Sequence, residues 1–281
     1  MRIDSHHHIW DLSVRPQSWM EGEELKPISR TILMNELEPE LEKANIDFTV
    51  IVQTVPTQNE TPELLDLSLS HPKVCAVVGW LDLESSDIRP QLDKYLNHKS
   101  GKNLVSIRDL AQDKSDPNWL IRPEVLSNIH RIGEAGLTFD ILTRPPQLAA
   151  AVRMVQQSPN NIFVLDHISK PYMAKGEMQP WNDQISEIAS YENVYVKVSG
   201  LFTEAKWNDW NYQTFQPYLD HVLNSFTPQR MMFGSDWPVC LLAATYSQTI
   251  QLMENFIKQF SLEEQKSFWS DTAKRAYRLR I

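Results

Sequence analysis

The 281-residue chain has only two cysteines, Cys75 and Cys240, and only eight glycines. Two isolated thiols provide neither a disulfide framework nor a CxxC metal pair. The glycines form neither a GxxxxGK[ST] nor a GxGxxG sequence. A loop that cradles a phosphate is therefore not expected, and most nucleotide-dependent chemistry is excluded with it.

Long apolar runs and excess positive charge are also lacking. The longest apolar run, residues 74–83, contains Gly79 and Asp82 and is far shorter than the ~20 residues that span a bilayer. The formal net charge of -9 argues against nucleic acid or an anionic membrane as a main partner, because both bind basic surfaces. No basic-then-apolar leader pattern is present, so we expect a cytoplasmic protein. The sequence leaves a homo-oligomer open.

The residues that are present alternate between two kinds of segment. Eight short apolar runs are followed by stretches whose apolar residues recur every three or four positions, several of them beginning with Pro, which is typical of helices. This alternation in a chain of this length predicts an α/β fold, a single (β/α)8 TIM barrel over residues 1–281. The predicted strands cover residues 3–8, 48–55, 74–83, 104–110, 137–142, 162–168, 194–200 and 231–235.

Two segments of the predicted barrel are informative in detail. In the first strand, "RIDSHHHIWD", alternate residues share a face, so we expect Asp4, His6 and His8 on one side and His7 on the other, toward the helix layer. Residues 12–30 are too many for a tight turn and are expected to form a loop over the barrel mouth.

In a TIM barrel the active site forms at the C-terminal ends of the strands. Ionisable residues end or follow five of the predicted strands. They are His6 and His8 in the first, Arg108 in the fourth, Asp140 and Arg144 in the fifth, Asp166 and His167 in the sixth, and Asp236 in the eighth. Three ionisable groups at the ends of the first and last strands, adjacent in a closed barrel, would be costly to bury without a purpose.

Five motifs in order resemble one protein family over nearly the whole chain. They are "DSHHHIWD", "SIRDLAQDKSDPNWLIRPEV", "FDILTRPPQL", "FVLDHISKP" and "MMFGSDWPV". The family is the amidohydrolase superfamily, and in particular the amidohydrolase-related branch that includes sugar-acid lactonases, such as L-fucono- and L-rhamnonolactonases, and 2-pyrone-4,6-dicarboxylate lactonase. The resemblance implies a barrel of the amidohydrolase type and a hydrolase that cleaves esters or amides.

The resemblance also bears on metal binding. Superfamily members with two metals have a carboxylated Lys or a Glu at strand four and a His at strand five, where this chain has Arg108 and Asp140. A binuclear centre is therefore not expected. His6, His8 and Asp236 could hold a single zinc with an open position for water. Because the resembled branch includes lactonases that work without metal, the sequence interpretation is that no cofactor is required, with one zinc as the alternative.

The leading interpretation is a hydrolase that opens the ring of a small lactone, most simply a sugar-acid lactone. By resemblance Asp236 would be the base that activates water, its pKa raised by partial burial, while His6, His8 and His167 polarise the carbonyl. Two alternatives stay open. One is a zinc-dependent amidohydrolase or decarboxylase acting on another small carboxylate substrate, and the other is a non-catalytic binding protein.

Other residues near the motifs are assigned to substrate or to structure. The guanidinium groups of Arg108 and Arg144 could bind a carboxylate or sugar hydroxyls. Aromatic faces that could stack on a sugar ring are those of Trp10, Trp80, Trp237 and Tyr172. Structural roles are expected for Asp140 as a partner of an arginine, for Asp166 as a group that orients a neighbour, for Lys170 as a solvated cation, and for His71, His98, His130 and His221 at the surface.

Overall fold

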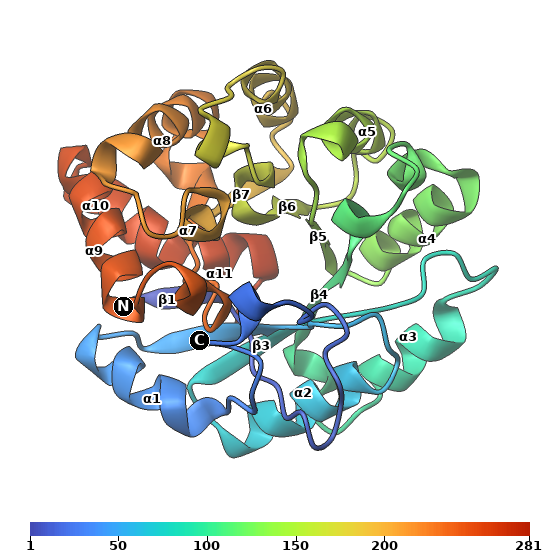
Figure 1. Cartoon of the computed structure of the whole chain (residues 1–281). Helices are drawn as coiled ribbons and strands as arrows, with labels where there is room; N and C mark the ends of the chain where they lie inside the picture. The colour runs from blue at the N-terminus through green and yellow to red at the C-terminus, as the bar shows by residue number, and fades with distance from the viewer.

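The computed structural model describes all 281 residues as eight parallel strands surrounded by helices (Figure 1). The strands pair in sequence order, and a parallel bridge between His7 and Trp237 brings the last strand back to the first. The nearly closed (β/α)8 barrel predicted from the sequence is therefore confirmed. Its strands are β1 (Ile3–His7), β2 (Phe48–Val52), β3 (Val74–Gly79), β4 (Leu104–Asp109), β5 (Thr138–Ile141), β6 (Phe163–Leu165), β7 (Val194–Val198) and β8 (Met231–Phe233).

The helices bury one apolar face each against the outside of the barrel, as their three-to-four-residue periodicity predicts. Proline occupies the first turn of α3, α4 and α5, where its missing N–H costs nothing. None of these helices has the length and apolar character needed to cross a membrane. Their bounds are α1 (Met34–Lys43), α2 (Glu60–Ser70), α3 (Arg89–Leu96), α4 (Pro123–Glu134), α5 (Pro145–Gln156), α6 (Trp181–Ala189), α7 (Leu201–Glu204), α8 (Tyr212–Phe226), α9 (Tyr246–Phe256), α10 (Leu262–Lys266) and α11 (Thr272–Tyr277).

The last helix, α11, closes the N-terminal end of the barrel. Its Ala273, Ala276 and Tyr277 pack with inward-facing residues of the strands, among them Ile3 and Met232, in one buried cluster. The Tyr277 hydroxyl donates a hydrogen bond of 2.7 Å to Asp140 Oδ2 on β5. The C-terminal helix is thus attached to the barrel interior by both apolar packing and a buried polar contact.

Above this apolar layer the barrel interior is charged. Lys197 on β7 lies 2.6 Å from Asp140 Oδ2 and 2.9 Å from Asp166 Oδ1, and all three side chains are fully buried. Burial outweighs the attraction of Lys197 and raises the pKa of Asp140. The expectation that Asp140 pairs with an arginine is wrong, because the inward position opposite it on β7 carries this lysine.

A bulge in β1 changes the predicted arrangement of its side chains. The pairing of β1 with β2 shifts register between Asp4 and His7. As a result Asp4 accepts a hydrogen bond of 3.0 Å from Tyr246 on α9, on the helix side of the strand. The prediction that Asp4 shares a face with His6 and His8 is therefore wrong, since alternation does not survive a bulge. His7 also lies outside the barrel, as expected, with Nε2 3.0 Å from Thr49 Oγ1.

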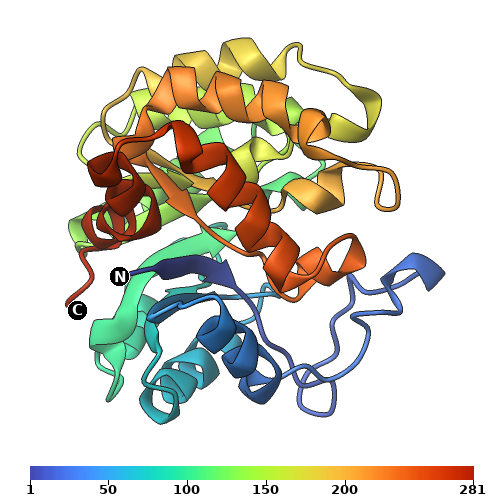
Figure 2. The same ribbon diagram turned by 90° about the vertical axis from the view of Figure 1, so that its left-hand side faces the viewer.

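The segment after β1 projects beyond the C-terminal ends of the strands, where Figure 2 shows it in blue at the right. Trp10 anchors it, because its Nε1 donates to the carbonyls of Ile28 and Arg30 at 3.2 and 2.8 Å. Trp10 also contacts Trp19 edge to face, with ring centroids 5.6 Å apart. This is the loop that the sequence places at the barrel mouth. His71, His98, His130 and His221, which were expected at the surface, are half-buried.

Replacing Tyr277 with Phe tests the attachment of α11. The variant keeps the ring but leaves a buried carboxylate oxygen of Asp140 without one donor, so we expect the free energy of unfolding to fall by about 1–3 kcal/mol. Urea unfolding followed by circular dichroism measures this. The control is Tyr195→Phe on β7, a half-buried tyrosine next to the same cluster whose hydroxyl has no partner. Equal stabilities of the two variants would show that the Tyr277 hydroxyl contributes nothing.

Candidate active site

Four of the residues predicted to be catalytic meet at the C-terminal end of the barrel. His6 Nε2 lies 3.2 Å from His8 Nε2 and 3.8 Å from Asp236 Oδ1. His8 Nε2 and His167 Nε2 lie 3.5 and 3.9 Å from the same oxygen of Asp236. All four residues are at most 5% exposed. The C-terminal ends of the strands thus bring together residues that lie up to 230 positions apart in the sequence, from His6 to Asp236.

Strained backbone holds two of these side chains. Residues 167–170 all have positive φ, between 47° and 59°, and Asp236 has a φ of 57°. Such conformations cost non-glycine residues of order 1–3 kcal/mol each and persist only where the surroundings impose them. Gly200 permits the turn at His167, because a Cβ on Gly200 would lie 2.6 Å from His167 Nδ1. The strain is concentrated at the site.

The outer nitrogens of the imidazoles are bonded to the protein. His8 Nδ1 lies 2.7 Å from the carbonyl of Val52, which only accepts, so the Nδ1 proton is fixed and the Nε2 of the neutral ring carries a lone pair. His167 Nδ1 lies 2.8 Å from Ser199 Oγ. His6 Nδ1 lies 3.5 Å from Asp166 Oδ1, while Arg108 Nη1 approaches its Nε2 at 3.3 Å. Lys197 Nζ also lies 3.2 Å from His6 Nδ1, so protein donors approach both nitrogens of His6, and only the tautomer of His8 is fixed by its partner.

The charge states follow from burial and neighbouring charges. Burial lowers the pKa of His167 to about 3 and that of His6 well below its usual value, so both rings are neutral at pH 7. Burial also acts to raise the pKa of Asp236, but His167, His8 and Lys170 outweigh it and the net pKa is lowered. The prediction of a raised pKa for Asp236 is therefore wrong, and this carboxylate is ionised.

The converging atoms fit a metal ion. Donor atoms about 2.1 Å from a tetrahedral zinc lie about 3.4 Å from one another. The predicted set of His6, His8 and Asp236 has separations of 3.2 to 3.8 Å. Ligand atoms of His6, His167 and Asp236 also lie within 4.8 Å of one another, so His167 joins the candidates. Two or three imidazoles and one carboxylate are ligands that zinc accepts.

A cavity of about 170 Å³ opens above these residues. It combines ionisable groups with four apolar side chains, and the loop over the mouth contributes Trp19. Its lining consists of His8, Trp19, Thr54, Arg108, Leu110, Gln112, Asp113, Leu142, His167, Lys170, Asp236 and Val239. A small, largely polar molecule that reaches the Asp236 carboxylate fits such a space.

The residues predicted to bind substrate are only partly placed here. Arg108 lines the cavity, but its guanidinium is occupied by Asp166 at 3.1 Å and by the Gln53 carbonyl. Arg144 lies outside the lining, paired with Glu204 at 3.1 Å. The sequence placed Lys170 in solvent, and it instead lies half-buried in the lining.

None of the four predicted aromatic residues lines the cavity. Trp10, Trp80 and Trp237 are at most 9% exposed and belong to the packed layers around the site, while Tyr172 lies under Lys175 with the ammonium 4.9 Å from the ring centroid. Proximity to a motif does not show which way a ring points, and large rings more often fill a core. Sequence reasoning missed Trp19, Gln112 and Lys197. Only Lys197 had a visible signal, as a lone lysine in an apolar strand.

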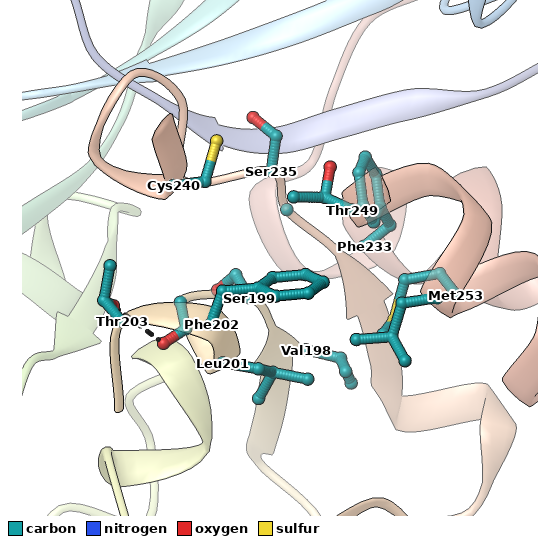
Figure 3. A pocket seen from close by; sticks show the side chains of 13 residues that line it. Val198, Ser199, Leu201, Phe202, Thr203, Phe233, Ser235, Cys240, Thr249 and Met253 are labelled. Carbon is teal, nitrogen blue, oxygen red and sulfur yellow. Dashed lines mark hydrogen bonds between the residues drawn. The ribbon is translucent and has the colours of Figure 1, made fainter. Parts of the chain in front are cut away.

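A second, mostly apolar cavity lies beside the site between the ends of β7 and β8 and helix α9 (Figure 3). Ser199, which bonds His167, is among its lining residues, together with Phe202, Phe233 and Met253. The cavity measures about 10 Å³, which is room for one water at most. It is a packing gap and cannot hold a substrate.

Comparison with known proteins finds relatives over most of the chain and a closely similar fold. An L-fucono-1,5-lactonase of Burkholderia ambifaria is 35% identical over 87% of this chain and 83% of its own length. An L-fucono-1,5-lactonase of Burkholderia multivorans is 31% identical over 99% and 96%. A crystal structure of a Burkholderia multivorans amidohydrolase with bound zinc has a TM-score of 0.93 at 31% identity and covers 99% of both chains.

The amidohydrolase family profile matches residues 3–279. This match covers nearly every residue and includes all five motifs on which the resemblance was based. The chain belongs to the amidohydrolase family.

Proposed function

We propose that this protein is a hydrolase that opens the ring of a sugar-acid lactone. The observation that carries the proposal is the convergence of the ionised Asp236 with three imidazoles on the floor of a mostly polar cavity. Two relatives at 35% and 31% identity are L-fucono-1,5-lactonases, which makes a 6-deoxy aldonic acid 1,5-lactone the first substrate to test.

Asp236 is the base of the proposed reaction. Its carboxylate accepts a proton from water, and the hydroxide adds to the lactone carbonyl carbon. The tetrahedral intermediate collapses with cleavage of the ring C–O bond. The leaving ring oxygen takes the proton back from Asp236, and an open-chain hydroxy acid results. The lowered pKa keeps this group unprotonated when substrate arrives and also makes it a weaker base.

The imidazoles are better suited to holding a cation than to donating to the oxyanion. The Nε2 of neutral His8 bears a lone pair, because its Nδ1 proton is held by Val52. His6 and Asp236, with either His8 or His167 as third ligand, would hold a zinc ion with an open position, and the ion when bound would polarise the carbonyl and acidify water. Arg108 Nη1 lies beside His6 on the cavity floor, where it is bound to Asp166. This assignment revises the sequence interpretation, in which the histidines themselves polarised the carbonyl.

Replacing Asp236 with Asn tests the base. The amide cannot accept the proton of water, so we expect kcat for hydrolysis of 6-deoxy aldono-1,5-lactones to fall by about 10²–10⁴-fold. A pH-indicator assay records the acid released. Asp113→Asn is the matched control, since Asp113 is an exposed carboxylate lining the same cavity, and its kcat should stay within a few-fold of the parent. A fully active Asp236→Asn enzyme would exclude the proposed base.

Removing the metal tests whether catalysis needs a bound cation. Protein dialysed against a chelator should lose most of its lactonase activity and regain it on addition of one equivalent of zinc, because the chelator removes the ion that would polarise the carbonyl and acidify water. Elemental analysis should find about one zinc per chain in the parent and much less in His8→Ala. His71→Ala, a histidine outside the site, should keep the metal. If the metal-free protein hydrolysed lactone at an undiminished rate, the histidines would instead be hydrogen-bond donors to the carbonyl oxygen.

A further inference from the structure

Lys170 occupies an unusual place at the edge of the site. It follows His167 by three residues in the left-handed turn, with a φ of 47°, and its backbone N–H donates to the His167 carbonyl at 2.8 Å. Its side chain is half-buried and lines the cavity that also contains Asp236 and His167. The turn that positions a candidate metal ligand therefore also directs a cation into the cavity.

The Lys170 ammonium has no partner in the protein. Its only hydrogen bond is the backbone one to His167, and no carboxylate oxygen lies within 4.0 Å of Nζ. A lysine has three N–H donors, and leaving them unpaired in a half-buried position is unfavourable unless water or a ligand accepts them. The cavity is the space that offers such an acceptor.

The two arginines near the site are paired with carboxylates, and the one nitrogen of Arg108 without a partner, Nε, is buried. Arg108 Nη1 is bound to Asp166 and lies against His6, and the Nη2 of the same guanidinium donates to the Gln53 carbonyl. Arg144 is bound to Glu204 outside the cavity lining. Lys170 is therefore the cation of the cavity whose donors are free for a substrate.

The charges around Lys170 indicate what kind of substrate it meets. Burial lowers the pKa of Lys170, Glu204 and Asp236 act to raise it, and Arg144 and Arg108 act to lower it, so that the net pKa is lowered. Within the lining, Lys170 and Arg108 are matched by Asp113 and Asp236, and Asp166 already neutralises Arg108 from below. Apart from a bound metal ion, the lining therefore has no net positive charge to balance a substrate carboxylate. A neutral, oxygen-rich ligand suits this arrangement better than a dicarboxylate.

We propose that Lys170 is a substrate-binding residue that donates hydrogen bonds to hydroxyl oxygens of a neutral polyhydroxy lactone and so selects it over hydroxyl-free and anionic lactones. This inference rests on the proposed function and names the substrate class of the same site. Apolar Trp19, Leu110, Leu142 and Val239 complete the lining and suit the carbon face of such a ring.

The test compares Lys170→Met on two neutral lactones. For a 6-deoxy aldono-1,5-lactone we expect KM to rise about 10- to 100-fold with kcat within a few-fold, as for the loss of a hydrogen bond to a charged group. For δ-valerolactone, which has the same ring but no hydroxyls, kcat/KM should be unchanged. Lys175→Met is the control, because this exposed lysine of the same segment lies over Tyr172 outside the cavity.

Three results would overturn the inference. The first is an unchanged KM in Lys170→Met. The second is an equal loss of kcat/KM on both lactones, which would mean that Lys170 has a structural role. The third is a preference of the wild-type enzyme for 2-pyrone-4,6-dicarboxylate over neutral lactones. Lactone binding to the non-hydrolysing Asp236→Asn protein, measured by calorimetry with and without Lys170→Met, separates this inference from the proposed function. If wild type hydrolyses no lactone, the proposed function fails. Tenfold weaker binding without Lys170 would still support the inference, whereas equal or absent binding would overturn it.

Discussion

The buried charge of Lys197 is the constraint on which the barrel interior depends. A fully buried ammonium is tolerable only when carboxylates meet it, and Asp140 and Asp166 do so at 2.6 and 2.9 Å. Removing one partner of such a group typically costs about 3–5 kcal/mol. The same two carboxylates also contact residues on the side away from the lysine. Asp140 receives the Tyr277 hydroxyl from α11 below, and Asp166 lies beside His6 above. One ion cluster thus joins the closure of the barrel to its chemical end.

From this cluster the geometry of the site follows upward. Burial alone would raise the pKa of Asp166, but Lys197, His6 and Arg108 keep it well below its usual value, so its negative charge is permanent. A permanent charge at this point fixes Arg108 and the orientation of the His6 ring. The strained turn at residues 167–170 and Gly200 then bring His167 over the same point from the other side. The ion cluster supports the site from below, and the strained turn fixes His167 from the side. The site is therefore organised before substrate arrives.

Sequence patterns predict those parts of this molecule that regular periodicity controls. The eight strands and the convergence of His6, His8, His167 and Asp236 follow from alternation and from the rule that strand ends meet. The bulge in β1 places Asp4 on the outside, because a register shift changes which residues before and after it share a face. Loop side chains have no period at all. The sequence could therefore not show that Trp19 and Lys170 enter the cavity, nor that Trp80 and Trp237 are packed away from it. The partners of Lys197 depend on the register of separate strands, which no local pattern contains.

The orientation of the lone pairs bears on which residues take part in bond cleavage and which in substrate recognition. A carboxylate and several neutral imidazole nitrogens that face one point repel one another unless a cation or a proton lies between them. The Val52 carbonyl fixes the proton of His8 on the outer nitrogen, and the low pKa of His167 disfavours a second proton there. A proton on His6 Nε2, which lies 3.2 Å from His8 Nε2, or a bound cation would offset the repulsion on the cavity floor. Lys170, at the side of the cavity, has further hydrogen-bond donors free for the substrate. The residues on the cavity floor are thus assigned to bond cleavage, and Lys170 at the side of the cavity is assigned to substrate recognition.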